Sequence, residues 1–413
     1  MKRSAPTVLM VTQFYWPEIV GSAPYCTDLA EWLAREGWRV RILTCRPHYP
    51  EGVVPVQYRD GLLDRETRRG ATIDRLPPWQ PARRGALGRM LGEFAFLGRG
   101  LWALATGRVS RSDVVISLCP SVLAVVLGRL SCRWGGHHVA MVHDIQSGLA
   151  SGLGMVGGSW LLRLMRALER WALNGTDGIF VLSENMRERL RNQGITTPIE
   201  VMPIWVDADL IQPVERTSGA PTTVLYSGNL GRKQALDQVI ELAEVLQRRG
   251  STLRVVVRGK GGEADRLMAE AANRGLRNIE FHPLVPADRF SESLAEGDVH
   301  LVPQDAATAD FAVPSKIYSI MAAGRPFVAT ALPDSHLWRL QQQTGAFQCV
   351  PPGDADALAD AVLALGADSR RREDLGARGR AFVVARHDKP VVLGGFEATL
   401  RKFIRVPIVK QPA

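Results

Sequence analysis

The stretch that decides the fold is residues 7–44, TVLMVTQFYWPEIVGSAPYCTDLAEWLAREGWRVRILT. Its two ends, 7–11 and 39–44, are short apolar runs of the kind that form parallel strands buried on both faces. Between them, residues 27–37 carry apolar side chains at helical spacing and finish on a glycine, a typical helix end. A strand, a helix and a second strand in this order predict a βαβ unit and therefore a parallel sheet.

The same alternation of strand and helix patterns continues through the first half of the chain and restarts in the second. Further strands are expected in the first half at 113–118, 137–142 and 178–182. After the restart, strands are expected at 223–228, 253–259, 279–281, 299–303 and 327–330. We therefore expect an α/β protein of two tandem, doubly wound Rossmann-like domains that face each other across an interdomain cleft.

A segment without sustained periodicity separates the two halves. Residues 202–221 contain three prolines and no helical or strand period, which is typical of a linker between domains. The expected divisions are a first domain at 1–205, a linker at 206–221, a second domain at 222–385 and a C-terminal segment at 386–413. Residues 387–406 are expected to form a helix that returns to the first domain.

Composition places the chain among ordinary globular proteins, with 413 residues, 46% hydrophobic and 23% charged. Its five cysteines are widely spaced and form no C-x-x-C pair, which argues against a disulfide framework or structural zinc and favours the cytoplasm. The basic N-terminus leads into a run of strand length and not a secretory signal. The longest apolar run, 114–128, is too short to cross a bilayer and contains Pro120. A formal charge of +9 favours anionic partners: nucleic acid, acidic lipid or phosphorylated substrates.

The stretch VPSKIYSIMAAGRP, residues 313–326, predicts a short helix that packs one face on a core. Ser315 is a suitable N-cap, and Gly324 with the proline after next is a typical stop. Lys316 falls in the first helical turn, where a cation is unfavourable unless an anion lies nearby. The stretch therefore predicts a phosphate site, and the alternative is a surface lysine on an ordinary capped helix.

Two turns of the second half support the phosphate site, because each follows a predicted strand and is rich in glycine and basic residues. Ligands of parallel sheets collect at the carboxyl ends of strands, and glycines let backbone N–H groups approach a phosphate closely. The alternative is that these glycines end their strands for purely structural reasons. The residues of the two turns taken as candidates are Gly228, Asn229, Arg232, Lys233, Arg258, Gly259 and Lys260.

The first half offers a second set of polar residues at strand ends. Gly21 and Ser22 open a helix after the first strand, which favours an anion. His143 and Asp144 end the strand at 137–142, where we expect a catalytic or binding role; the alternative is a satisfied core histidine. The triplets DAD at 207–209 and 354–356 are interpreted as structural, and no metal site is expected.

The segment 83–111 combines an apolar helical stripe with surrounding arginines and a single acidic residue, Glu93. Such a helix either lies on anionic lipid or packs inside the first domain with solvated arginines. The stripe consists of Leu87, Met90, Leu91, Phe94, Leu97, Leu101 and Leu104, and the arginines are Arg83, Arg84, Arg89, Arg99, Arg108 and Arg111.

Four passages can be compared with known families: the opening loop, helix and strand at 14–52, VLSENMRERLRNQGI with VMPIWVD at 181–207, YSGNLGRKQALDQVI at 226–240 and VPSKIYSIMAAGRPFVAT at 313–330. Together they resemble the retaining GT-B glycosyltransferases of family 4, and especially their bacterial capsule, colanic-acid and O-antigen branch. The sequence departs from the family at four positions. Ser22 replaces a glycine, Ile204 replaces an asparagine, and Phe311 and Ser319 stand where many relatives carry two glutamates.

The resemblance implies a nucleotide-sugar donor, UDP- or GDP-linked, held mainly by the second domain as a substrate and without a further cofactor. The diphosphate would lie at Lys233 and at Pro314, Ser315 and Lys316, and the ribose near Ser319. Asp310, beside the first missing glutamate, is a candidate to replace it. In the first domain, which would hold the acceptor, Gly21 and His143 or Asp144 would border the transferred sugar.

The implied reaction is a sugar transfer with retention and no enzyme nucleophile, in which Lys233 and Lys316 stabilise charge on the departing diphosphate. The implied acceptor is a polyprenyl-diphosphate-linked saccharide of bacterial surface polysaccharide synthesis, reached from the inner face of the cell membrane by a peripheral enzyme. The alternatives are a sugar-nucleotide epimerase on the same fold and a non-catalytic nucleotide-sugar binder. Nucleic acid is not an expected partner, because the arginines are not interleaved with stacking aromatics.

Overall fold

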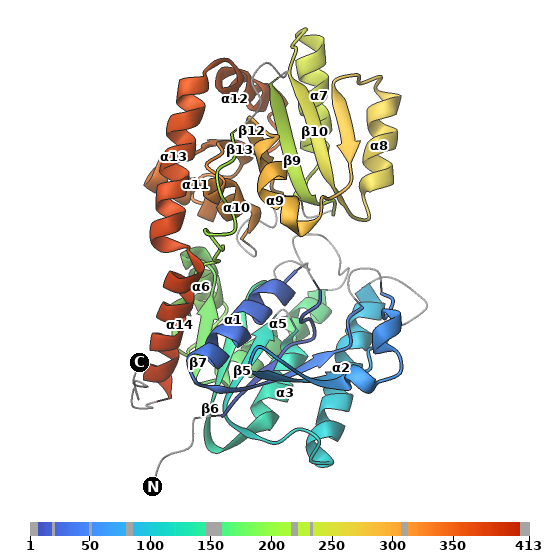
Figure 1. Cartoon of the computed structure of the whole chain (residues 1–413), viewed down its shortest axis with the longest axis vertical. Coiled ribbons are helices and arrows are strands. Elements are labelled where there is room, and N and C mark those ends of the chain that lie inside the picture. The colour runs from blue at the N-terminus through green and yellow to red at the C-terminus, as the bar shows by residue number, and fades with distance from the viewer. Residues whose placement is uncertain are drawn as a thin grey trace. The chain divides into compact units, whose positions relative to one another are not determined.

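The computed structural model describes residues 7–18, 21–48, 52–79, 86–119, 121–145, 159–215, 222–231, 234–306 and 313–404. The chain divides into two compact units (Figure 1). The first comprises Met1–Met202 with Leu393–Ala413, and the second comprises Pro203–Val392. Each unit is an α/β domain with its own sheet, so the fold class expected from the sequence is confirmed.

The first unit has an eight-stranded sheet in the order β3-β4-β2-β1-β5-β6-β7-β8. All neighbours are parallel except β3 and β4, and the chain reverses its direction of travel across the sheet at β1, which pairs with both β2 and β5. The strands are β1 Thr7–Val11, β2 Arg39–Cys45, β3 Arg65–Arg68, β4 Ala71–Leu76, β5 Ser112–Cys119, β6 Cys132–Val142, β7 Gly178–Val181 and β8 Ile199–Val201.

Helices cover the sheet, and local sequence sets where they begin. The Ser121 side chain accepts the Ala124 N–H and Ser183 accepts the Met186 N–H, each at 3.3 Å, so both serines cap their helices. The first helix begins earlier than expected, at Ala23, because its second residue is a proline suited to a helix start. The helices are α1 Ala23–Arg35, α2 Ala86–Ala105, α3 Val122–Ser131, α5 Ser159–Asn174 and α6 Glu184–Asn192.

The last helix, α14 Lys389–Phe403, belongs to the first unit from Leu393 onward. The ring of Phe396 lies 4.5 Å from that of Phe180 on β7. The Glu397 carboxylate accepts the indole N–H of Trp38 at 2.9 Å. A C-terminal segment therefore completes the core of the first unit.

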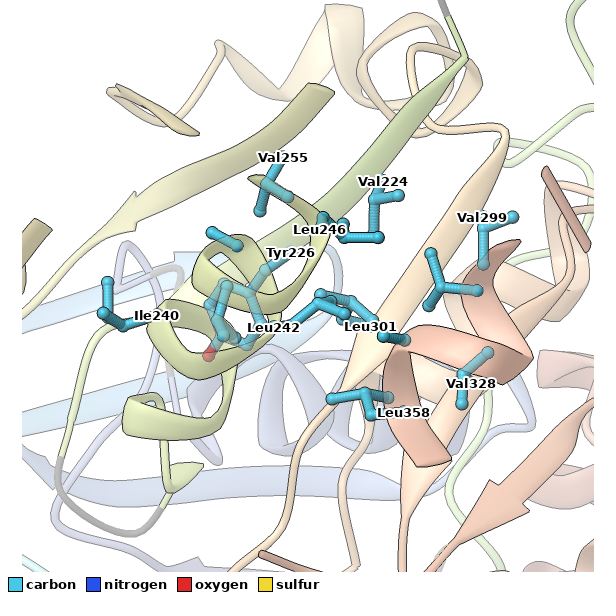
Figure 2. Packing of buried hydrophobic residues seen from close by; sticks show 14 of the residues in the cluster. Val224, Tyr226, Ile240, Leu242, Leu246, Val255, Val299, Leu301, Val328 and Leu358 are labelled. Atoms are coloured by element: carbon cyan, nitrogen blue, oxygen red, sulfur yellow. The ribbon is translucent and has the colours of Figure 1, made fainter. Parts of the chain in front are cut away.

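The second unit has a six-stranded, wholly parallel sheet in the order β11-β10-β9-β12-β13-β14. Its strands are β9 Thr223–Asn229, β10 Arg254–Lys260, β11 Ile279–His282, β12 Val299–Val302, β13 Phe327–Thr330 and β14 Gln348–Val350. Its helices are α7 Asp237–Arg248, α8 Ala264–Asn273, α9 Phe290–Ala295, α10 Lys316–Ala322, α11 His336–Thr344, α12 Ala355–Ala367 and α13 Ser369–Arg386. On one face of the sheet, Val224, Val255, Leu301 and their strand neighbours pack against α7 and α12 (Figure 2). Each such buried side chain contributes about 1.5–3 kcal/mol of transfer free energy.

Both acidic triplets have structural roles. The Asp354 carboxylate accepts the Ala357 N–H at 2.8 Å and caps α12. The Asp207 carboxylate accepts the Leu210 N–H at 3.1 Å in a turn of the second unit.

Within the described ranges, no helix combines the length and hydropathy that a transmembrane span requires.

Candidate functional site

The second sheet has a topological switch point between β9 and β12. From β9 the chain proceeds outward through β10 and β11, then returns to place β12 on the other side of β9. Ligands of open parallel sheets bind outside the carboxyl ends of the two strands that flank such a point. In register, Ser227, Gly228 and Asn229 pair with Arg258, Gly259 and Lys260, so the two glycine-rich turns lie level at this edge.

Gly228 and Lys316 meet at the switch point, although 87 positions separate them in the sequence. A Cβ atom on Gly228 would lie 2.9 Å from the Lys316 ammonium nitrogen. Gly228 also has a φ of 146°, which residues with a side chain rarely adopt. The end of β9 and the start of α10 therefore lie against each other, and the backbone conformation of Gly228 favours glycine there.

The Lys316 ammonium lies on an aromatic ring that was not predicted from the sequence as part of the site. Its Nζ lies 3.7 Å from the ring centroid of Tyr226, a fully buried residue of β9. The Tyr226 hydroxyl donates to the Asn229 carbonyl oxygen at 2.7 Å, which fixes the turn that carries Gly228. The available signal was the aromatic residue immediately before the Ser-Gly-Asn turn.

Lys316 has a cation–π contact but no ion pair with a carboxylate among the described residues. Burial lowers its pKa to about 7, because the partly apolar surroundings disfavour the ammonium form. A cation held at a sheet edge without a counterion is suited to an anionic ligand.

The glycines of the two turns also let the turns pack backbone against backbone. A Cβ on Gly259 would overlap the Gly228 carbonyl oxygen, and one on Gly261 would overlap that of Leu230. The Leu230 N–H donates to the Lys260 carbonyl oxygen at 3.0 Å. The structural explanation of the glycines therefore holds for Gly259 and Gly261, whereas Gly228 is required beside Lys316.

Ser315 does not cap α10 as the sequence suggested. It occupies the N-cap position, but its φ and ψ of −57° and −27° are already helical and its side chain accepts no backbone N–H. A capping hydroxyl needs extended backbone to reach back to the second or third N–H, so this expectation was wrong. The Ser319 side chain, one turn later, is partly exposed and makes no hydrogen bond within the described residues.

The remaining candidates of the second unit are placed differently or lie outside the described residues. The Arg258 guanidinium pairs with Glu296 and donates to the Pro283 carbonyl oxygen at 3.0 Å. It is therefore engaged within its own unit. Arg232, Lys233 and Asp310 lie outside the described residues, as does Phe311.

In the first unit, the start of α1 and the end of β6 come together. The ring of Tyr25, three residues after Ser22, meets the His143 ring edge-on at 5.8 Å. The Ser22 side chain makes no capping hydrogen bond, and Gly21 has a positive φ of 66°. Burial lowers the pKa of His143 to about 4, and its Nε2 has no partner in this part of the structure. His143 is therefore neutral at pH 7, with Asp144 next to it at the sheet edge.

Glu18 is a further residue of this edge that sequence reasoning missed. One carboxylate oxygen accepts the Tyr15 N–H at 3.3 Å and the other accepts the His48 N–H at 2.8 Å. These bonds tie the loop after β1 to the loop after β2. A carboxylate directly after proline in the Gly21 loop was the available signal.

On α2, most of the predicted apolar stripe faces outward. Met90, Leu91, Phe94 and Leu101 are exposed, while Leu97 and Leu104 pack on the core cluster of the first unit. Arg99 donates to the Pro77 carbonyl oxygen, and Arg108, exposed and just beyond the helix, donates to that of Arg75. Arg83 and Arg84, like the side chains of Leu87 and Arg89, lie outside what is described. The helix therefore packs one side on the core of the first unit and leaves the other side exposed.

Two α/β domains, one on a largely parallel sheet and one on a wholly parallel sheet, are the arrangement of the GT-B fold. Comparison with known families agrees: residues 20–205 match the Glycosyl transferase 4-like domain, and residues 221–368 match Glycosyl transferases group 1. WcaI of Escherichia coli K12, named for colanic acid biosynthesis, is 31% identical over 361 residues, which cover 83% of this chain and 88% of that protein. The chain therefore belongs to this glycosyltransferase family and is a transferase.

Solved structures share the whole fold. Sucrose-phosphate synthase from Thermosynechococcus elongatus superposes with a TM-score of 0.75 at 18% identity, covering 97% of this chain and 99% of that one. HepE of Anabaena, in a complex with UDP-glucose, superposes with a TM-score of 0.70 at 14% identity, covering 96% and 100%. The family and fold predicted from the sequence motifs are confirmed.

Proposed function

We propose that this glycosyltransferase moves a sugar, with retention of configuration, from a UDP- or GDP-linked donor to a polyprenyl-diphosphate-linked saccharide of bacterial surface polysaccharide synthesis. The observation that carries the donor site is the Lys316 ammonium, unpaired with any carboxylate of the described residues and held beside Gly228 at the switch point. The UDP-glucose bound to HepE and the colanic acid role in the name of WcaI support the donor and pathway classes.

The donor's diphosphate is the group that Lys316 would bind. As the bond between the sugar and the diphosphate breaks, the electron pair stays on the diphosphate, whose negative charge grows. The acceptor hydroxyl oxygen attacks the same face of the sugar and passes its proton to the leaving diphosphate oxygen. Lys316, with Arg232 and Lys233, stabilises this charge more in the transition state than in the ground state, which accelerates the transfer.

The other donor contacts follow from the same edge of the sheet. The backbone of Gly228 and Asn229 lines the phosphates, with Gly259 and Lys260 on the neighbouring turn. Ser315 would contribute its hydroxyl and Ser319 would face the ribose, with Asp310 in place of the family glutamate. We assign Arg258 to holding β10 against α9, because its guanidinium is already engaged by Glu296.

The first unit is proposed to hold the acceptor. His143, neutral at pH 7, can accept a hydrogen bond from a sugar hydroxyl or donate one to it. Asp144 and Gly21 lie at the same sheet edge. The outward apolar face of α2, within the segment 83–111, supports contact with the anionic inner surface of the cell membrane.

The experiment that tests the reaction class is incubation with UDP-, GDP- and dTDP-sugars, with and without membrane extract. The expected result is nucleotide release that requires both one of the donors and the extract, with the labelled sugar recovered in the lipid fraction. Conversion of the donor without extract would identify an epimerase. Donor binding without conversion in either mixture would identify a non-catalytic binder.

A further inference from the structure

The helix α5, Ser159–Asn174, carries an apolar stripe that faces away from the protein. Trp160, Leu164, Leu168 and Trp171 are spaced four, four and three residues apart and therefore share one face of the helix. Their exposed fractions are 65%, 56%, 37% and 57%. The opposite side is the packed one, where Ala172 and Leu173 are buried. The stripe is therefore not part of the packed core of the first unit.

Arginines flank this stripe on one side. Arg163, Arg166 and Arg170 follow one another at helical spacing and all three side chains are exposed. The one carboxylate in the helix sequence, Glu169, is buried. The exposed surface of α5 is therefore apolar along one line and cationic along the next.

The stripe of α5 lies on the same face of the first unit as the exposed side of α2. The connections from β4 to β5, β5 to β6 and β6 to β7 all advance in one direction across the sheet. Right-handed crossovers therefore place α2, α3 and α5 on one face, and α3 packs against both of the others. Two helices of one layer thus present large apolar side chains to the outside.

We propose that the α5 stripe inserts into the headgroup region of an anionic bilayer, as a membrane-binding element separate from α2. Tryptophan prefers the membrane interface, leucines between two tryptophans supply apolar area, and arginines alongside bind lipid phosphates while their stems stay on the apolar surface. A second copy of the chain is a poorer occupant, because it brings the same arginines and the same formal charge of +9.

This inference rests on the proposed function, because the lipid-linked acceptor is the reason for the protein to bind a membrane. A helix that joins two parallel strands begins at the carboxyl-end edge of the sheet, so α2 and α5 both start at the edge that carries His143 and Asp144. Insertion of both helices would hold this edge beside the headgroup of a lipid-linked saccharide.

The test is flotation of the full-length protein with vesicles of phosphatidylcholine alone and of phosphatidylcholine with phosphatidylglycerol. The variant is Trp160→Ser with Trp171→Ser, and the matched control is Trp134→Ser, an exposed tryptophan on β6 outside α5. We expect the wild type and the control to bind the anionic vesicles, and the double variant to bind at least about tenfold more weakly. Equal binding by the double variant would overturn the inference.

Two further measurements separate the causes of a negative result. Sedimentation velocity without lipid is expected to show the same oligomeric state for wild type and double variant; a wild-type dimer that the variant loses would make α5 a protein interface and overturn the inference. Binding of UDP- and GDP-sugars in the absence of lipid is expected to be unchanged by the variant. If the wild type binds neither, the proposed function fails while the vesicle result still decides the role of α5.

Discussion

Lys316 differs from an ordinary surface lysine in what surrounds its ammonium group. Its Nζ lies on the Tyr226 ring and against Gly228, and no carboxylate among the described residues pairs with it. Burial without a counterion costs free energy, which the lowered pKa of about 7 reflects. A bound ligand phosphate would offset that cost. The arrangement therefore suits a donor site, whereas in a purely structural site it would only destabilise the protein.

The titration of Lys316 predicts how donor affinity depends on pH. The ammonium form has a pKa of about 7 in the unliganded protein, and a bound diphosphate raises that pKa by charge attraction. Above pH 7, donor binding must therefore be accompanied by proton uptake. Calorimetry with a nucleotide sugar, whose diphosphate does not titrate in this range, should show affinity falling between pH 7 and 9 by up to about tenfold per pH unit. Lys316→Ala should bind more weakly, with no such slope. A slope that persists in this variant would assign the proton to another group.

Tyr226 is expected to act as a positioning residue for Lys316. Tyr226→Phe keeps the ring under Nζ and removes the hydrogen bond to the Asn229 carbonyl oxygen, at a cost of about 1 kcal/mol. Tyr226→Leu also removes the cation–π contact. Donor KM should rise modestly for the first variant and more for the second, and the Leu variant should shift the pH dependence of donor binding. Two variants with equal KM and unshifted pH profiles would show that Tyr226 is only a core residue.

At the scale of the element, the turn after β9 is the part that sequence alone described best. Its glycines predicted a strand end at this edge of the sheet, because strand ends and turn glycines are local signals. The contact of Lys316 with Gly228 and Tyr226 joins two segments distant in sequence, β9 and the start of α10, so no local pattern could show it. The same limit explains why Ser315 was taken as a cap, because its helical backbone angles depend on the tertiary structure.

Two glycines of these turns give a matched comparison. Gly228→Ala should lower donor binding and turnover at least about tenfold, because a Cβ would lie 2.9 Å from the Lys316 Nζ at a φ of 146°. Gly262→Ala adds a Cβ with no atom within 4 Å and should leave both unchanged. Activity assays and thermal melts of both variants check this. Equal activity of the two would mean that the Gly228 turn does not form the site.

Strand patterns predicted the sheet more completely at its centre than at its edges. The expected strands at 7–11, 39–44 and 113–118 correspond to β1, β2 and β5, because central parallel strands are continuous apolar runs. The edge strands β3, β8 and β14 and the strand β4 beside β3 were not predicted, since they are short or mixed in polarity. The α5 stripe was also missed, because exposed and buried apolar residues at helical spacing look the same in a sequence.

At the scale of the whole molecule, the chain crosses twice between its units. It enters the second unit at Pro203 and returns to the first at Leu393, within α14. The sequence predicted two tandem α/β domains because the strand and helix alternation restarts after the proline-containing segment. Phe396 and Glu397 of the returning helix contact Phe180 and Trp38, which lie 216 and 359 positions earlier in the sequence, so no local pattern indicates these particular contacts.

The returning helix is expected to stabilise the first unit. Phe396 is 2% exposed and packs on Phe180, so Phe396→Ala should lower the free energy of unfolding of that unit by about 3–5 kcal/mol. Denaturant unfolding followed by intrinsic fluorescence measures the change. The exposed Lys402 on the same helix provides the control, Lys402→Ala, with an expected change within about 0.5 kcal/mol. Equal stability of the two variants would mean that α14 contributes little to the first unit.

If Lys316 stabilises the departing nucleotide diphosphate, Lys316→Ala must slow turnover. The rate of donor-dependent nucleotide release is measured with saturating acceptor extract for Lys316→Ala, the wild type and Lys402→Ala. We expect a loss of at least about tenfold for Lys316→Ala, the size of one charge-assisted contact to a leaving group, and no loss for the control. A folded Lys316→Ala protein that turns over at the wild-type rate would show that Lys316 does not act on the leaving group.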